Sequence, residues 1–412
     1  MERILIGPFK QVVSLVDMPL KGALKDEQLQ VIADAGILVE AGRILAVDSY
    51  AALQAQATRT FNVPANSVAV PSYIDCHTHI AFGGNRANDF ALRNAGASYL
   101  EIAKAGGGIW STVQHTRAAT DAALVASIVQ RANELLAQGI TTIEVKSGYG
   151  LSLDEELKML RAIKEAQKEL AVELIPTCLA AHMKPKDFEG DNKAYLQSIA
   201  KELFPIIKKE NLSNRIDAFI EETAFTADEI QDYFQAAKDM GFDITVHADQ
   251  FTPSGSAVAV AFGACSADHL EASTEVEIAL LAQSDTVAVA LPGASLGLGC
   301  AFTPARKLLD QGAALAIATD WNPGSAPMGQ LMTQASILAT VEKLSNAEVF
   351  AALTYRAAKA LNLSDRGRLA VGELADFTIY NSDNYQNITY LQGSLQPAQV
   401  WKNGEIIFTK GN

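Results

Sequence analysis

Residues 68–79 read Val-Ala-Val-Pro-Ser-Tyr-Ile-Asp-Cys-His-Thr-His, an apolar run that ends in a group of polar residues. The run 68–75 predicts a buried β-strand, because strands of a parallel sheet are covered on both faces and are apolar throughout. Two histidines, His77 and His79, follow this run at a spacing of two. The stretch therefore predicts a parallel sheet that carries chemical groups at the carboxyl end of a strand.

Seven more apolar runs predict buried strands, at residues 140–146, 171–180, 216–220, 244–247, 264–270, 285–291 and 315–319. Helical patterns lie between most of them. Apolar residues recur at helical spacing over 124–136 and stop before Gly139. Capping boxes predict further helix starts at Ser152, Thr226, Thr274 and Ser345.

Eight strands alternating with helices predict an α/β fold, most simply a closed (β/α)₈ TIM-like barrel. The alternative is an open, doubly wound sheet. That fold usually has a glycine-rich phosphate loop after its first strand, and the chain has no GxGxxG or GxxxxGK[ST] motif.

Both ends of the chain are rich in short strands. Apolar segments around Gly42 predict one hairpin, and residues 400–407 predict another around Asn403-Gly404. Residues 376–380 predict a further strand. These patterns predict a second, smaller β-sandwich domain built from both termini, residues 1–68 plus 371–412, around a barrel domain of residues 69–370.

Composition limits the classes of function. The 412 residues are 49% hydrophobic and 19% charged, with a net charge of −14, which argues against nucleic acid and against a polybasic membrane surface as partners. The four cysteines form no CxxC pair, which fits a reducing cytoplasm. The longest apolar stretch, 286–302, contains Pro292 and three glycines and is a poor membrane span. We therefore expect a cytoplasmic protein with a small-molecule substrate.

Five of the six histidines lie at or just after the ends of predicted strands, and Asp320 ends the eighth. His77 and His79 point the same way, because side chains alternate along an extended chain. With His247 and Asp320 they would form a metal site of nitrogen and oxygen ligands that leaves one position open for water. Such a set suits zinc or iron and is typical of a catalytic site.

The sequence resembles the amidohydrolase superfamily, whose first barrel strand ends in PxxxDxHxH. The motif here runs from Pro71 to His79, and residues 371–377 resemble the family's return into the terminal domain. The resemblance implies metal dependence. Glu221 and Glu222 stand at the end of the fourth strand, where some members have a metal-bridging lysine. One divalent or trivalent metal ion per chain, Zn or Fe, is therefore expected.

Seven segments extend the resemblance to the imidazolonepropionase family: residues 82–86, 95–103, 106–109, 144–150, 247–250, 266–270 and 320–325. The resemblance implies hydrolysis of 4-imidazolone-5-propanoate to N-formimidoyl-L-glutamate in histidine degradation, by a homodimer. Residues 251–256 and 295–300 depart from the family pattern, which leaves the shape of those two loops open.

The resemblance also implies roles for single residues. Asp320 would move a proton, His269 would polarise the carbonyl or move the proton itself, and Gln250 would orient the ring, since an amide cannot act as a base. The residues implied in substrate binding are Arg86, Tyr149, His182, Gln250, Asn322, Gly324 and Ser325.

Each binding role has a structural alternative. Arg86 could pair with Asp89, Tyr149 could pack in its loop, and His182 could be a metal ligand or bond to a backbone carbonyl. His115 is expected in a loop, either a lid or an ordinary surface segment. Trp321 is expected to point away from the metal.

Two other functions remain open at this point. A deaminase of the same superfamily, acting on a heterocyclic ring, would share the metal ligands. A non-catalytic scaffold with the same fold would have no need for so many histidines at one rim.

Overall fold

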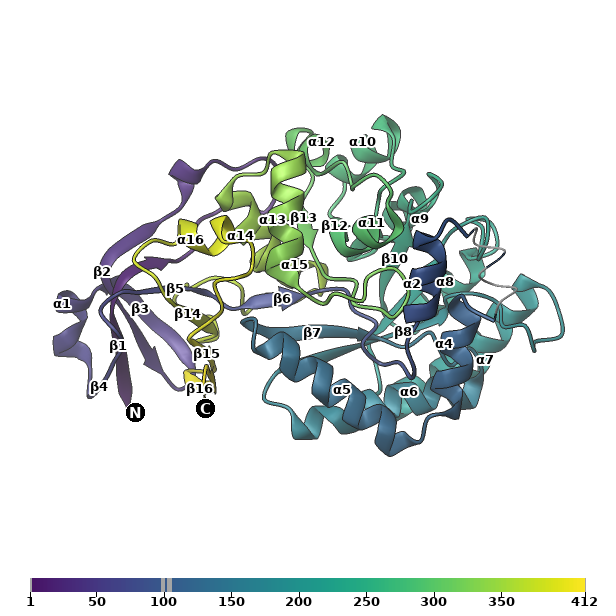
Figure 1. Ribbon diagram of the computed structural model, residues 1–412, viewed down its shortest axis with the longest axis horizontal. Helices are drawn as coiled ribbons and strands as arrows, with labels where there is room; N and C mark the ends of the chain where they lie inside the picture. Colours follow the sequence, from purple (N-terminus) through teal and green to yellow (C-terminus); the bar gives the residue numbers. More distant parts are fainter. Residues whose placement is uncertain (1, 98–100, 102–105, 412) are drawn as a thin grey trace.

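A computed structural model describes residues 2–97, 101 and 106–411. Its centre is a sheet of eight parallel strands that follow one another in chain order around a barrel (Figure 1). The strands are β6 Tyr73–Asp75, β7 Ile140–Lys146, β8 Glu173–Ala181, β9 Arg215–Phe219, β10 Asp243–Ala248, β11 Ser266–His269, β12 Val287–Ala290 and β13 Leu315–Ile317. Each lies within or beside a predicted run, so the predicted α/β barrel is confirmed.

The first and last strands meet just past their carboxyl ends. Thr78 forms a parallel bridge with Trp321, and the amide of Asp320 donates to the carbonyl of His77 at 3.0 Å. The buried carboxylate of Asp75 accepts from the amide of Thr319 at 3.0 Å and from its hydroxyl at 2.6 Å. The seam therefore closes at the histidine end, and the open-sheet alternative is wrong.

Helices cover the outside of the barrel (Figure 1). They are α2 Ala87–Asn94, α4 Ile109–Ala118, α5 Asp121–Leu136, α6 Leu153–Ala166, α7 Asn192–Glu210, α8 Gln231–Asp239, α9 Gly255–Phe262, α10 Glu275–Gln283, α11 Pro292–Leu298, α12 Ala305–Asp310, α13 Leu331–Glu342, α14 Asn346–Leu353 and α15 Tyr355–Ala360. The apolar positions predicted for 124–136 form the buried face of α5.

The predicted capping boxes differ in outcome. Those at Thr274 and Ser345 form as expected and begin α10 and α14. Ser152 is the N-cap residue of α6 but makes no capping hydrogen bond. Thr226 and Glu229 bond to each other reciprocally, yet they close a turn ahead of α8, so the helix start predicted there is wrong.

The two ends of the chain form a second sheet, which lies beside the barrel in Figure 1 and contains both termini. Its strands are β1 Arg3–Val13, β2 Val31–Glu40, β3 Arg43–Ser49, β4 Arg59–Asn62, β5 Ser67–Pro71, β14 Phe377–Asn381, β15 Gln399–Lys402 and β16 Glu405–Thr409. The predicted terminal hairpins are therefore present. Phe9, Ile37, Phe377 and Trp401 belong to its separate apolar core.

The run 68–75 is divided between the two sheets. β5 pairs with β14 in the terminal sheet, whereas β6 begins the barrel two residues after β5 ends. The prediction of one strand over this run is wrong, because an unbroken apolar run looks the same whether it serves one buried sheet or two. The domain limits near residues 68 and 371 stay a prediction.

The remaining described elements are small: α1 Tyr50–Leu53, α16 Gln386–Tyr390, and the 3₁₀ turns η1 Asp26–Gln28, η2 Gln54–Gln56 and η3 Gln167–Glu169.

The predicted places of two ring side chains differ in outcome. His115 lies in α4 rather than in a loop, because Gly108 ends the glycine run and the helix starts directly after it. Trp321 packs against the barrel core, as predicted. Within the described ranges, no helix combines the length and apolarity needed to cross a bilayer.

Candidate metal centre and substrate pocket

Three imidazole nitrogens and one carboxylate oxygen meet at the carboxyl end of the barrel. The Nε2 atom of His79 lies 3.2 Å from the Nε2 atoms of both His77 and His247. The Oδ1 atom of Asp320 lies 3.4 Å from His79 Nε2 and 3.5 Å from His77 Nε2. The structure therefore brings together all four residues predicted as metal ligands, and each is at most 3% exposed.

In two of these rings, the contact made by Nδ1 determines which nitrogen carries the hydrogen. His77 Nδ1 lies 2.6 Å from a carboxylate oxygen of Asp268, and His247 Nδ1 lies 2.9 Å from one of Asp217. A carboxylate accepts hydrogen, so each Nδ1 bears the proton and each Nε2 presents a lone pair. Burial and neighbouring positive groups lower the pKa of His77 and His79, and burial lowers the pKa of His247, so all three rings are neutral.

Lone pairs and a carboxylate at such short distances repel one another unless a cation lies among them. Burial raises the pKa of Asp320 to about 7, which shows how poorly this pocket holds a lone negative charge. A divalent ion would supply the missing positive charge, and neutral imidazoles with a carboxylate are suitable ligands for one. The donor set therefore fits the predicted zinc or iron ion.

His269 lies beside the same centre. A ring nitrogen of His269 lies within 4.8 Å of a ring nitrogen of His77 and of a carboxylate oxygen of Asp320. Its ring centroid is 5.4 Å from that of His247. Burial opposes a charge on this ring, but the carboxylates of Glu271, Asp320 and Asp268 together outweigh burial and raise the pKa of His269. His269 can therefore carry a proton, unlike the other three imidazoles, and its predicted role in the reaction stays a prediction.

An unusual backbone angle lets two neighbours in sequence reach one site. Asp268 contacts His77, and His269 also faces the cluster, although consecutive residues of a regular strand point in opposite directions. His269 has a φ of +86°, which turns the chain at the end of β11. Asp320, at φ +51°, occupies a similar position after β13. Such angles are uncommon for residues other than glycine and are often found at functional sites.

Beneath the histidines, the barrel interior holds a cluster of acidic and basic side chains that the sequence analysis missed. Lys146 Nζ lies 2.8 Å from Glu144, 2.8 Å from Asp217 and 3.7 Å from Asp268, and all four side chains are fully buried. The ammonium thus links the two carboxylates that orient His77 and His247. Burial opposes its charge, but the three carboxylates outweigh burial and raise the pKa of Lys146.

A pocket of about 200 Å³ opens above the histidines. Its walls include all seven residues predicted to bind substrate: Arg86, Tyr149, His182, Gln250, Asn322, Gly324 and Ser325. His79, His247, His269 and Asp320 also line it. These eleven residues, all singled out from the sequence, therefore share one cavity with Arg93, which the sequence analysis did not consider.

The structural contacts expected as alternatives to substrate binding are present at three pocket residues. Arg86 Nε donates to Asp89 at 2.8 Å, and the Nδ1 atom of His182 bonds to the carbonyl of Gly148 at 3.0 Å. The ring of His182 nevertheless stacks on His79, with centroids 5.6 Å apart. Tyr149 is 3% exposed and packs in its loop. Each side chain still faces the pocket, so these contacts hold the side chains in place and leave the predicted roles open.

Buried side-chain oxygens shape the loops of the pocket. Glu156 accepts from the amides of Gly150 and Leu151 at 2.8 Å and so holds the loop that carries Tyr149. Asn322 Oδ1 accepts from the amides of Gly324 and Ser325 at 2.8 Å. The two loops whose sequences depart from the family pattern, residues 251–256 and 295–300, are also held in place. Glu221 holds residues 251–252 through their amides, and residues 295–300 contain the last turn of α11 and its left-handed glycine cap.

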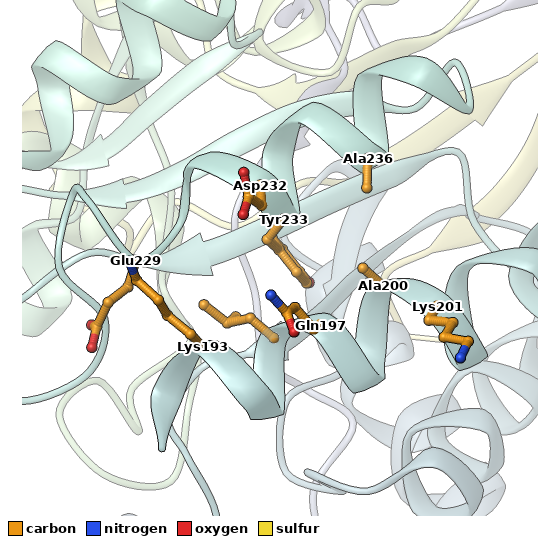
Figure 2. Close-up of a pocket in the computed structure, with 9 residues that line it drawn as sticks. Lys193, Gln197, Ala200, Lys201, Glu229, Asp232, Tyr233 and Ala236 are labelled. Atoms are coloured by element: carbon orange, nitrogen blue, oxygen red, sulfur yellow. The ribbon is translucent and has the colours of Figure 1, made fainter. Parts of the chain in front are cut away.

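A second hollow, of about 360 Å³, lies between α7 and α8 (Figure 2). Figure 2 shows Tyr233 between the two helices, with the Lys201 ammonium and the Asp232 carboxylate extending away from the groove. It is larger than the histidine pocket, but none of the residues that line it is a histidine or a cysteine. It lies on the outer helices, away from the carboxyl ends of the strands where barrel enzymes carry out chemistry.

Comparison with known proteins agrees with this geometry. A sequence model described as the amidohydrolase family matches residues 68–407. The chain belongs to the amidohydrolase family. It is 37% identical to an imidazolonepropionase of Bacillus cytotoxicus over 95% of this chain and 94% of the relative. It is also 40% identical to an imidazolonepropionase of Bacillus mycoides, over 83% of this chain and 81% of the relative.

Solved structures of the same fold include a triazine hydrolase variant, with a TM-score of 0.77, 17% identity, and coverage of 99% of this chain and 95% of that one. An adenosine deaminase from Xanthomonas campestris with bound zinc gives a TM-score of 0.71 at 20% identity, over 99% and 93% of the two chains. At these identities the likeness concerns the fold alone. The amidohydrolase family match and the curated relatives identify this chain as a hydrolase.

Proposed function

We propose that this chain hydrolyses the cyclic amide of 4-imidazolone-5-propanoate to give N-formimidoyl-L-glutamate. The observation that carries the proposal is the meeting of His77, His79, His247 and Asp320 at the floor of the pocket that Arg86 lines. That arrangement suits a ring that must be opened and an acidic tail that must be held. The names of the curated relatives support the same reaction over ring deamination.

His77, His79, His247 and Asp320 would hold one zinc or iron ion per chain. When bound, such an ion activates water and polarises a carbonyl. Asp268 and Asp217 keep His77 and His247 in the tautomer that can ligate. This second layer of carboxylates also increases the basicity of the rings.

Asp320 also takes part in the proton steps, and the other pocket residues bind and orient the substrate. Asp320 accepts the proton of the attacking water and passes it to the ring nitrogen that leaves, since one of its oxygens can remain free. His269 lies close enough to stabilise the carbonyl oxygen as it gains charge. Gln250 orients the ring through its amide. Arg86, Tyr149 and His182 hold the substrate, and Asn322, Gly324 and Ser325 hold the end of the product that resembles glutamate.

The reaction and its metal requirement can be tested together. Purified protein is expected to contain about one metal ion per chain and to consume 4-imidazolone-5-propanoate with formation of N-formimidoyl-L-glutamate. A chelator should stop the reaction, and added zinc or iron should restore it. His79→Ala should lose both metal and activity, because it removes the nitrogen nearest the other ligands. Two tightly bound ions per chain, or ammonia release without ring opening, would contradict the proposal.

Gln250→Ala is expected to lower turnover without abolishing it. A neutral amide can orient a substrate but cannot take its proton, so its loss removes hydrogen bonds worth about 0.5–1.5 kcal/mol. That corresponds to a decrease in kcat/KM of roughly 2- to 15-fold. Steady-state kinetics on the metal-loaded variant would measure it. A loss of several orders of magnitude would instead place Gln250 in the proton path.

A further inference from the structure

Arg86 and Arg93 both line the substrate pocket, although only Arg86 stood out in the sequence. Arg86 is the residue before α2, and Arg93 lies near its end. Seven residues are close to two turns of a helix, so both side chains leave α2 on one side. The pocket thus has two guanidinium groups on one wall.

The guanidinium of Arg86 already donates a hydrogen bond to a protein carboxylate. Its Nε donates to Asp89 Oδ2 at 2.8 Å, and the same oxygen accepts from the amide of Gly108 at 2.8 Å. Its Nη1 lies against Gly324, because a Cβ atom added to that glycine would be only 2.3 Å from Nη1. Arg86 therefore cannot present its Nε–Nη2 edge to a substrate carboxylate without leaving Asp89.

The same edge of Arg93 is unpaired. Its Nε and Nη2 are both shielded from solvent, and neither has a hydrogen-bond partner among the residues that the structure describes. Elsewhere in the chain, Arg161 uses the same two atoms to grip Glu210, at 2.9 and 2.7 Å. Shielded donors without partners are rare and unfavourable, and a paired edge of this kind matches a carboxylate.

Local charge favours an anion at the same place. Two guanidinium groups stand here, and the carboxylate of Asp89 pairs with one of them, that of Arg86. Burial and the charge of Arg86 lower the pKa of Arg93, whereas Asp89 raises it less. A second carboxylate would balance the pair and supply the missing acceptors. The protein as a whole carries a net charge of −14, so an acidic substrate needs such a local positive site.

We propose that the Nε–Nη2 edge of Arg93 binds the propanoate carboxylate of the substrate, with Arg86 beside it as a second, weaker contact. This inference rests on the proposed function, because the propanoate tail belongs to the substrate proposed above. It assigns the recognition of the tail to a residue that lies outside the metal centre.

The test compares full-length, metal-loaded Arg93→Met and Arg93→Lys with wild type. Arg161→Met is the matched control, since it removes an arginine that uses the same edge far from the pocket. Arg93→Met should raise KM for 4-imidazolone-5-propanoate about 10- to 100-fold and change kcat less than 3-fold. Turnover of 4-imidazolone, which lacks the tail, should stay unchanged. Arg161→Met should match wild type on both compounds.

A binding measurement separates this inference from the reaction. Imidazole-4-propanoate carries the ring and tail but no amide to hydrolyse, and calorimetry would compare it with 4-methylimidazole. Wild type should prefer the acid, and both Arg93 variants should lose most of that preference; Arg93→Lys gives the answer if Arg93→Met does not fold. An unchanged preference in a folded variant overturns the inference while the reaction stands. A lost preference in a protein that never opens the ring upholds the subsite and overturns the proposed reaction.

Discussion

Asp320→Asn is expected to lower kcat at least 10²-fold, the range for loss of a general acid–base group. The carboxylate of Asp320 lies 3.4 Å from His79 Nε2 and lines the pocket, so it stands between the candidate ligands and the substrate. Asparagine has the same shape but cannot hold the proton of the attacking water. The measurement is steady-state turnover with added zinc or iron and with metal content determined in the same samples.

Metal content decides how such a loss is interpreted. A variant that keeps its ion and loses turnover assigns the proton to Asp320, and one that loses its ion assigns Asp320 to the ligand set first. Gln250→Ala is the matched control, since it changes a neighbouring pocket residue that cannot move a proton. If Asp320→Asn keeps near-normal turnover with metal bound, the assignment to Asp320 is wrong. His269 is then the remaining candidate, because it is the imidazole at the centre whose pKa is raised.

Lys146→Met is expected to lower the free energy of unfolding by about 3–5 kcal/mol, the usual cost of removing one partner of a buried ion pair. Lys146 lies 2.8 Å from both Glu144 and Asp217, and no part of these side chains reaches solvent. Methionine fills a similar volume but leaves three buried carboxylates without the ammonium, and of these Glu144 still has Arg215 at 3.5 Å. Urea denaturation of the metal-free protein would measure the change.

Lys168→Met is the matched control for this substitution. Lys168 pairs with Glu165 at 2.6 Å, but the two side chains are 64% and 56% exposed. Exposed pairs contribute little, so the control should change stability by less than about 1 kcal/mol. Equal effects of the two substitutions would show that the buried cluster does not depend on its lysine. Added zinc should reduce the loss in Lys146→Met, since a cation at the histidines offsets part of the unbalanced negative charge.

Much of the candidate site could be predicted because its chemistry is local in sequence. His77 and His79 are two residues apart at the end of one strand, and any regular strand places such a pair on one side. His247, His269 and Asp320 each follow an apolar run. Once the runs form a barrel in chain order, their ends must meet at one rim.

The outer layer of the site could not be predicted in this way. Glu144, Lys146, Asp217 and Asp268 lie inside predicted strands, and the resemblance of segments 144–150 and 266–270 to the family assigned none of them a role. Their signal is a charge in a run that is otherwise apolar, and such a residue has no assignable partner until the strands are closed into a barrel. Arg93 was missed for a related reason, because an arginine on a helix near the surface is ordinarily solvated.

The sequence by itself determined the number of barrel strands, their order, the terminal sheet and the residues that gather at the histidine rim. Those features follow from hydrophobic periodicity and strand direction, which each segment carries alone. Only the tertiary structure decided that the run 68–75 serves two sheets, that Asp89 bonds to Arg86, and that the Nε–Nη2 edge of Arg93 has no partner within the described ranges. These depend on which groups compete for the same hydrogen bonds, and that competition exists only once distant segments are packed together.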